Sequence, residues 1–262
     1  GTNGCTEQER GLYVDLTSSI DHLTISNSAF NNLAYGWYIQ KQVSAETSTV
    51  SNVEVSNTSF YHNIIKGIYS EKLSDANFTS IVVDQNGYDA TLLSGCSHFQ
   101  PWMAGIDLNL KAGTYQNITI DQSSITNNGL GGAKEGVGLA IKGRGTGNDP
   151  SYQAFPAMVT NITLTNNTIT GNERGIRLGE PGKTNTGPTN VVVYHNTLAN
   201  NIQTYSGVDG SAYGDLVNQS TNLADAENNY WGRRSLHRWS PKFMAVQIIN
   251  PGVIAISPFA LT

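Results

Sequence analysis

Residues 20–39 of the chain read IDHLTISNSAFNNLAYGWYI, and residues 159–178 read VTNITLTNNTITGNERGIRL. The two segments align without a gap, with apolar residues at the same alternating positions and Gly36 opposite Gly175. A degenerate repeat of about 20–40 residues, built from short alternating runs, is typical of a stacked solenoid. The alignment therefore predicts coils that lie one upon another.

Each copy of the repeat contains three short apolar runs. Leu23 and Ile25 alternate with a polar residue, so their side chains point the same way from one strand. Phe30 supplies a second inward position, and Gly36 begins a third strand. Three strands per coil, each pairing with its counterpart in the next coil, predict an all-β, single-stranded right-handed parallel β-helix of about seven to eight coils.

A turn-forming residue ends the first strand of each copy. Asn favours turns and tolerates left-handed backbone conformations. Stacked coils would place these side chains about 4.8 Å apart, where amides can hydrogen-bond along the axis as an asparagine ladder. In the third copy we take Ile81 and Val83 as the strand that precedes the turn. The ladder is predicted at Asn27, Asn57, Gln85, Gln122, Asn166 and His195.

The composition narrows the range of partners. The 262 residues carry a net charge of −5, and only 13% are charged, against about 25% in typical domains. This acidic balance argues against nucleic acid, which requires a basic footprint. No apolar run reaches the roughly 18 residues of a membrane span. We see no linker and predict one domain over residues 1–262, with a processed or trimmed start.

Both ends of the rod need protection, because an open solenoid end exposes strand edges and core. We predict a C-terminal cap from about residue 226 to 262, with Tyr230, Trp231, Trp239 and Phe259 as its aromatic residues. The N-terminal end has few residues before the first coil. Either a neighbour covers it, through self-association or a larger surface assembly, or part of a longer protein precedes it.

The chain contains two cysteines, Cys5 and Cys96. They form a disulfide if the protein is exported, or they are two unpaired thiols. Gly- and Asn-rich insertions flank the strand that follows the repeated glycine, and long loops beside a rigid scaffold usually shape a binding site. These insertions are residues 88–104, 129–137, 143–157, 179–188 and 205–214.

The phrase NNTITGNERGIRL at 166–178 and the phrase ENNYWG at 227–232 resemble the right-handed β-helix superfamily. It includes pectate-lyase-like and alginate-lyase-like enzymes, uronan epimerases and several glycoside hydrolases. The resemblance implies a secreted or cell-surface protein that acts on a polysaccharide. It also implies a substrate groove across the sheet formed by the strands after the glycine.

The outward positions of that sheet fall into two columns. The first half of this face is aromatic and acidic, and the second half is basic. The first column is Tyr13, Tyr38, Tyr69, Asp107, Ala140 and Arg177. The second column is Asp15, Gln40, Glu71, Asn109, Lys142 and Gly179.

The first functional hypothesis is a lyase or epimerase of an acidic polysaccharide. Removal of the proton beside a carboxylate requires a base and a cation, and Lys142 and Arg177 are arranged like the base and neutraliser of such lyases. Glu71, Asp107 and Asn109 can hold a Ca²⁺ ion that bridges the substrate carboxylate. The chain departs from the family patterns, since it lacks the Asp-Pro-His-Asp run of mannuronan epimerases and the dense Asp cluster of pectate lyases.

The second hypothesis is a glycoside hydrolase that uses Glu71 and Asp107. Their predicted backbone separation of roughly 8 Å suits an inverting pair, whereas the alternative is two ordinary surface carboxylates. The third hypothesis is a non-catalytic adhesin, fibre subunit or sugar-binding module, because fold does not decide function. An enzyme is favoured over a passive binder.

Aromatic residues at one-coil spacing suggest platforms for sugar rings. The alternative is tyrosine packing across neighbouring strands, which stabilises a sheet face. The predicted substrate-binding residues are Tyr13, Tyr38, Tyr69, Asn109 and Gln40.

Overall fold

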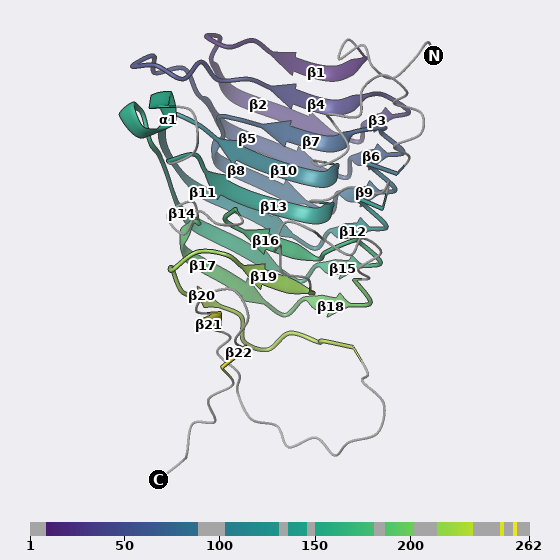
Figure 1. The fold of residues 1–262 in the computed structure, drawn as a ribbon. Coiled ribbons are helices and arrows are strands. Elements are labelled where there is room, and N and C mark those ends of the chain that lie inside the picture. Colours follow the sequence, from purple (N-terminus) through teal and green to yellow (C-terminus); the bar gives the residue numbers. More distant parts are fainter. Residues whose placement is uncertain are drawn as a thin grey trace.

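The protein is a right-handed parallel β-helix, as the computed structural model in Figure 1 shows. The structure describes residues 9–88, 103–130, 136–145, 150–180, 187–201 and 214–232, together with the backbone of 247–248 and 254–255. Within these ranges, sheets A and B have seven strands each and sheet C has six. The described part of the chain contains no helix that is long and apolar enough to cross a membrane.

Sheet A is formed by the strands that follow the repeated glycine or contain it. Neighbouring strands of the sheet come from successive coils and pair in parallel. Sheet A contains β1 (Arg10–Val14), β4 (Tyr35–Ile39), β7 (Lys66–Ser70), β10 (Ala104–Leu110), β13 (Val137–Gly143), β16 (Ile176–Leu178) and β19 (Leu216–Asn218).

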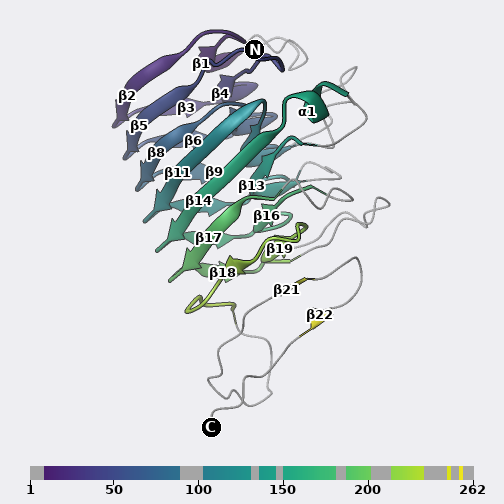
Figure 2. The ribbon, with the colours of Figure 1, turned by 90° about the vertical axis from the view of Figure 1, so that its left-hand side faces the viewer.

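Sheets B and C complete each coil, and Figure 2 shows their strands stacked along the rod. Sheet B contains β2 (Ile20–Ser26), β5 (Val50–Ser56), β8 (Ser74–Thr79), β11 (Gly113–Asp121), β14 (Ala157–Thr165), β17 (Thr189–Tyr194) and β20 (Ala224–Asp225). Sheet C contains β3 (Ala29–Asn31), β6 (Ser59–Tyr61), β9 (Val82–Asp84), β12 (Ser124–Thr126), β15 (Thr168–Thr170) and β18 (Thr197–Ala199).

Three further elements lie outside the sheets. Helix α1 (Pro150–Ala154) lies in the connection from sheet A to sheet B, and β21 (Gln247–Ile248) pairs antiparallel with β22 (Ile254–Ala255). Residues 20–39 and 159–178 span equivalent strands, β2–β3–β4 and β14–β15–β16. The fold predicted from the repeat is therefore confirmed.

The interior of the coil is filled by the apolar residues of the repeat. Val53, Val55 and Phe60 of the second coil are buried. Burying one such side chain contributes about 1.5–3 kcal/mol, and every coil repeats the set. The equivalent residues of the first coil, which include Leu23 and Ile25, are only partly buried. The first coil is the end of each sheet among the described residues, and residues 1–8 lie outside them.

The repeated glycine makes room for the neighbouring coil. A Cβ atom on Gly105 would lie 2.6 Å from the carbonyl oxygen of Gly138 and 2.8 Å from Cγ of Asn128. A Cβ atom on Gly67 or Gly138 would likewise lie close to the carbonyl oxygen of the glycine in the next coil and to the side chain of a buried asparagine. From Gly67 onward the glycine column therefore makes room for a column of asparagine side chains, whereas Gly11 and Gly36 make room for Phe30 and Phe60.

The asparagine ladder is present, but on other residues than we predicted. None of the six predicted side chains is buried, and all six residues adopt positive φ as turn residues. The residue that follows each turn residue points inward instead. The longer ladder consists of Asn63, Asn86, Asn128, Asn172 and Asn201. A second ladder consists of Asn167, Asn196 and Asn229.

The third coil also differs from the sequence prediction. Ala76 and Phe78 on β8 are the inward pair of sheet B, whereas Val83 lies on β9 of sheet C. Gln85 therefore belongs to the turn after the sheet C strand. The turn after the sheet B strand, where we predicted Gln85, is occupied by Ser80. Both strands alternate with the same period, so the pattern alone could not separate them.

At the C-terminal end, the start of the predicted cap joins the stack. Tyr230 pairs with Thr197 through a parallel bridge, and Trp231 packs against the core. Trp239 and Phe259 lie outside the described residues, as do Cys5, Cys96 and most of the insertions. The cap boundary and the disulfide remain predictions.

Candidate functional site

The outer face of sheet A has the predicted columns in the predicted register. Tyr13, Tyr38, Tyr69 and Asp107 are successive pairing partners, and Asn109 pairs with Lys142. A third outward column, made by the residue before each glycine, includes Arg10, Tyr35 and Lys66. We did not predict this column, although its fixed place before the repeated glycine would have identified it.

The tyrosines of this face stack on one another. The ring centroids of Tyr13 and Tyr38 are 6.1 Å apart, and those of Tyr38 and Tyr69 are 5.5 Å apart, with nearly parallel planes. Arg10 lies over the first two rings and Lys66 over the third. Tyr38 is only 8% exposed, whereas Tyr13 is 46% exposed. This geometry favours packing across strands for Tyr38 and leaves Tyr13 as the accessible ring.

Gln40 connects two of these rings. Its side-chain oxygen accepts a hydrogen bond from the Tyr13 hydroxyl (3.0 Å), and its amide nitrogen donates to the Tyr38 hydroxyl (3.2 Å). The Tyr13 hydroxyl also lies 3.2 Å from Oδ1 of Asp15. The predicted sugar-binding residues at this end of sheet A therefore form one hydrogen-bonded group.

Asp107 is the centre of a buried cluster of charges. Its Oδ2 accepts a hydrogen bond from Lys66 Nζ at 2.6 Å, and its Oδ1 lies 3.9 Å from Lys142 Nζ. Burial alone would raise the pKa of Asp107, but Lys142, Lys66 and Arg177 outweigh it and hold the pKa well below its usual range. Asp107 is therefore an anion at neutral pH and cannot act as a general acid.

Glu71 is fully engaged by its neighbours. Its Oε1 accepts a hydrogen bond from the Tyr69 hydroxyl (2.6 Å) and pairs with Lys111, and its Oε2 accepts from the backbone N–H of Lys41 (2.8 Å). It is 4% exposed. These contacts tie β7 to the two adjacent turns. Glu71 and Asp107 therefore do not form the open pair of carboxylates that an inverting hydrolase uses.

Three buried polar atoms of this cluster make no hydrogen bond among the described residues, namely Oδ1 of Asp107, Oδ1 of Asn109 and Nε of Arg177. Oδ1 of Asp107 and Oδ1 of Asn109 are both buried without a donor. Lys142, whose side chain is 5% exposed, has Asp107 as its nearest anion at 3.9 Å, beyond hydrogen-bond distance. Asn109 Nδ2 donates to the Tyr69 hydroxyl (2.9 Å), which fixes the orientation of its amide. Unsatisfied buried polar groups cost about 1–3 kcal/mol each, so this cluster is suited to a polar ligand.

Arg177 lies in the same column as Asp107, two strands further along the rod. It is 2% exposed. Between them in the column lies Ala140, whose methyl group is fully buried beside Ala104 and Val137. The structure therefore brings together Lys142 and Arg177, as the sequence predicts, around a carboxylate.

The residues do not fit a Ca²⁺ site. Glu71 and Asp107 are each paired with a lysine, and a nearby ammonium group repels a cation. Nowhere in the described ranges do three or more His, Cys, Asp or Glu side chains gather as metal ligands.

No protein-family model, curated protein or solved structure matches the chain.

The basic residues of the described part of the chain are confined to one side of the coil. The strands of sheets B and C contain no lysine or arginine. Every described lysine and arginine lies on sheet A or in a segment that adjoins it. Four of these basic side chains, those of Lys41, Lys66, Lys111 and Arg144, pair with carboxylates on the same side of the coil.

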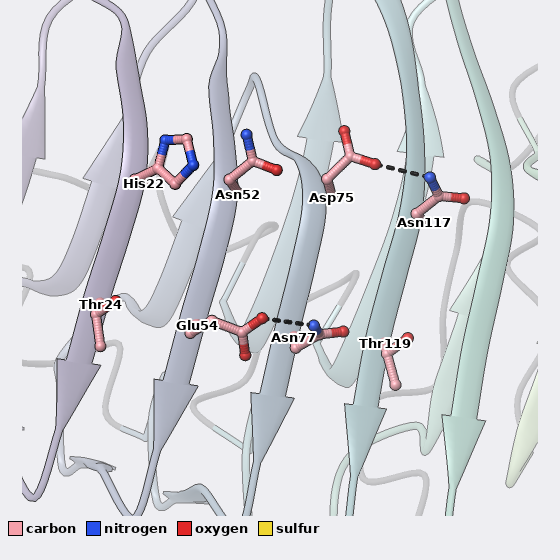
Figure 3. Close-up of a pocket in the computed structure, with 8 residues that line it drawn as sticks. All are labelled: His22, Thr24, Asn52, Glu54, Asp75, Asn77, Asn117 and Thr119. Atoms are coloured by element: carbon pink, nitrogen blue, oxygen red, sulfur yellow. Dashed lines mark hydrogen bonds between the residues drawn. The ribbon is translucent and has the colours of Figure 1, made fainter.

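A shallow concavity of about 420 Å³ lies on the outer face of sheet B (Figure 3). Asn117 donates to Asp75 (2.7 Å), and Asn77 donates to Glu54 (2.7 Å). The His22 ring lies at one end, 2.9 Å from Asp21. These side chains satisfy one another across neighbouring coils, so the concavity carries no catalytic group in need of a partner.

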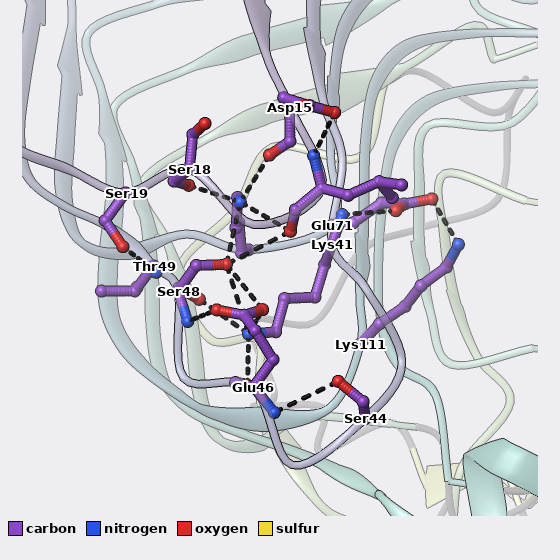
Figure 4. A network of polar contacts seen from close by, with 12 residues as sticks. Asp15, Ser18, Ser19, Lys41, Ser44, Glu46, Ser48, Thr49, Glu71 and Lys111 are labelled. Carbon is purple, nitrogen blue, oxygen red and sulfur yellow. Dashed lines mark hydrogen bonds and ion pairs between the residues drawn. The ribbon is translucent and has the colours of Figure 1, made fainter.

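A network of buried lysines joins the first three coils at the corner between sheets A and B (Figure 4). Lys72 Nζ donates to the carbonyl oxygens of Asp15, Leu16 and Ser18 at 2.6–3.1 Å and to Oγ of Ser48 (3.0 Å). Burial lowers the pKa of Lys72 to about 8. Because the ammonium group satisfies three backbone carbonyls, its role is structural.

Proposed function

We propose that this chain is a carbohydrate-active protein, secreted or at the cell surface, which binds an acidic polysaccharide on sheet A and cleaves or epimerises it as a lyase or epimerase. The proposal follows the resemblance to the pectate-lyase-like β-helix superfamily. The observation that carries it is the pair of buried oxygens without a donor, Oδ1 of Asp107 and Oδ1 of Asn109, in a cluster that also contains the Lys142 ammonium group.

A sugar acid has the groups that this cluster lacks. Its carboxylate can accept from Lys142, and its hydroxyl groups can donate to Oδ1 of Asp107 and Oδ1 of Asn109. Charge-assisted hydrogen bonds of this kind are about twice as strong as neutral ones. A neutral polymer would offer Lys142 no carboxylate closer than that of Asp107 at 3.9 Å, so the cluster favours an acidic polymer.

The same residues can perform a proton abstraction. Once the Lys142 ammonium group has released one proton to solvent, its amine can take the proton from the carbon beside the substrate carboxylate, and Arg177 stabilises the negative charge that develops on that carboxylate. In a lyase the electron pair forms a carbon–carbon double bond as the glycosidic C–O bond breaks, and the departing oxygen takes a proton. In an epimerase the carbon regains a proton on its other face.

The hydrolase alternative is weaker because Asp107 remains ionised and Glu71 is held by three partners. The non-catalytic alternative is favoured by one observation, the tyrosine stack, in which rings that would otherwise bind sugar pack on each other. A passive binder would retain affinity for the polymer without altering it, whereas a structural subunit would neither bind nor alter the polymer.

The test incubates the protein with alginate, polygalacturonate and neutral polysaccharides, and follows absorbance from unsaturated uronates and the release of reducing ends. An epimerase is detected by proton exchange with deuterated water. We expect Lys142→Met to abolish turnover and Asn109→Ala to lower it by about tenfold or more. Asn77→Ala, an exposed amide on sheet B, is the matched control.

Reducing ends without new absorbance would identify a hydrolase. Binding without any product would identify a passive binder. Equal activity of Lys142→Met and wild type would remove Lys142 from the chemistry, and no binding of any acidic polymer would refute the proposal.

A further inference from the structure

A second cavity, of about 440 Å³, lies at the corner where sheet A leads into sheet B. It results from unequal turn lengths. The connections 40–49 and 144–156 are long, whereas the intervening connections 71–73 and 111–112 are short. Residues 44–49 of the first long connection and residues 154–156 of the second form two walls, and the short connections leave a notch between them.

The lining of the notch is almost uncharged. Its two charged residues, Lys41 and Glu46, pair with each other at 2.8 Å. Lys41 Nζ also donates to the carbonyl oxygens of Glu46 (2.7 Å) and Ser48 (2.9 Å), so its protons point into the wall (Figure 4). The remaining surface offers neutral hydroxyl groups and apolar groups only.

The lining of the notch contains hydroxyl groups and an aromatic ring, and both kinds of group can bind a sugar ring. Thr47 and Thr114 are exposed and bring hydroxyl groups, and the half-buried Phe155 brings an aromatic ring. A ring with an apolar face and polar edges fits an aromatic surface with hydrogen-bonding groups beside it. The volume also lies within the usual range of about 300–1,000 Å³ for small-ligand sites.

The backbone at the floor of the notch is strained. Ala112 has φ of +46°, and it is the one apolar residue among the described non-glycine residues with positive φ. The left-handed conformation costs an L-residue about 1–2 kcal/mol. Such strain gathers at ligand sites, where the surrounding structure imposes it.

The notch adjoins the proposed polysaccharide site through one residue. Oε2 of Glu71, which stands in the second column of sheet A, accepts a hydrogen bond from the backbone N–H of Lys41, which lines the notch. We propose that the notch binds a neutral sugar unit, carried as a side branch by the acidic polysaccharide whose backbone lies on sheet A. This inference rests on the proposed function and adds a branched substrate to it.

The test compares binding of linear polygalacturonate with binding of a pectin that carries neutral galactose and arabinose branches. Thr114→Trp fills the notch from an exposed position, and Thr24→Trp on sheet B is its matched control. We expect Thr114→Trp and Phe155→Ala to weaken binding of the branched polymer about five- to tenfold and to leave the linear polymer unchanged. Unchanged thermal unfolding confirms that each variant is folded.

Equal weakening for both polymers, or no weakening for either, would overturn the notch as a branch site. If the wild type binds neither polymer, the proposed function fails by itself. Saturation-transfer NMR with free galactobiose and arabinobiose then tests whether the notch binds neutral sugars. A transfer signal that disappears in Thr114→Trp and persists in Thr24→Trp supports the notch, and no transfer signal to the wild type refutes it.

Discussion

Replacing Asn128 by alanine interrupts the longer asparagine ladder at its centre. Oδ1 of Asn128 accepts hydrogen bonds from the backbone N–H and from Nδ2 of Asn86, both at 2.9 Å. Its Nδ2 donates to Val83 O (2.9 Å) and to Asn172 Oδ1 (3.0 Å). The substitution therefore removes four hydrogen bonds in a region from which water is excluded.

The expected loss of stability follows from these hydrogen bonds. A buried N–H group that loses its acceptor costs about 1–3 kcal/mol, and each of the other broken bonds costs about 0.5–1.5 kcal/mol before relaxation. The side chain is fully buried, so the vacated space adds to the penalty. We expect the free energy of unfolding to fall by about 3 kcal/mol or more.

The measurement is urea unfolding followed by circular dichroism, with Asn77→Ala as the control. Asn77 is exposed on sheet B, and its side chain donates a hydrogen bond to Glu54, so the loss of stability in this variant should stay within about 0.5 kcal/mol. The two variants are compared by how far each lowers the free energy of unfolding. If the decrease for Asn128→Ala exceeds that for Asn77→Ala by less than about 1 kcal/mol, the ladder does not hold the coils together.

Three further predictions concern stability. Gly105→Ala should lower the free energy of unfolding by about 2 kcal/mol or more, because the added Cβ meets a backbone oxygen at 2.6 Å; a neutral effect in thermal unfolding would contradict this. Ala112→Gly should raise it by about 0.5–1 kcal/mol, because it relieves the left-handed strain at a smaller cost in unfolded-state entropy; a decrease in the same assay would show that packing of the methyl group outweighs the strain. Because burial lowers the pKa of Lys72 to about 8, against about 10.4 in the unfolded chain, the unfolded state binds more protons between these values. The wild type should therefore gain stability relative to Lys72→Met from pH 8 to pH 10, and a constant difference in urea unfolding across that range would refute the assignment.

The repeat could be predicted from the sequence because the patterns that specify it are local. Alternation at Leu23 and Ile25, a turn former after them and a glycine further on specify strand, turn and strand within one coil. Register across sheet A followed as well, since coils of the same pattern stack position on position. For this reason the columns that contain Tyr38 and Lys142 were predicted correctly.

The sequence did not reveal which residue of each turn points into the core. Asn166 and Asn167 are adjacent and chemically identical, and the left-handed backbone at the first turns the second into the core. In the third coil, β8 and β9 carry the same alternation, so either could be assigned to sheet B. Lys66 was missed because we considered only the outward positions after the repeated glycine, whereas Lys66 stands immediately before Gly67.

Sequence by itself determined the winding of this protein, because short-range alternation, turn residues and glycine act within a few bonds of one another. Tertiary structure alone decided which side chains of sheet A are engaged and which are not. Glu71 is held by residues 30 and 40 positions away, whereas Asp107 Oδ1 has no hydrogen-bond donor among the described residues. Hydrogen bonds and Coulomb interactions depend on distances between coils, and those distances exist only when the chain is wound.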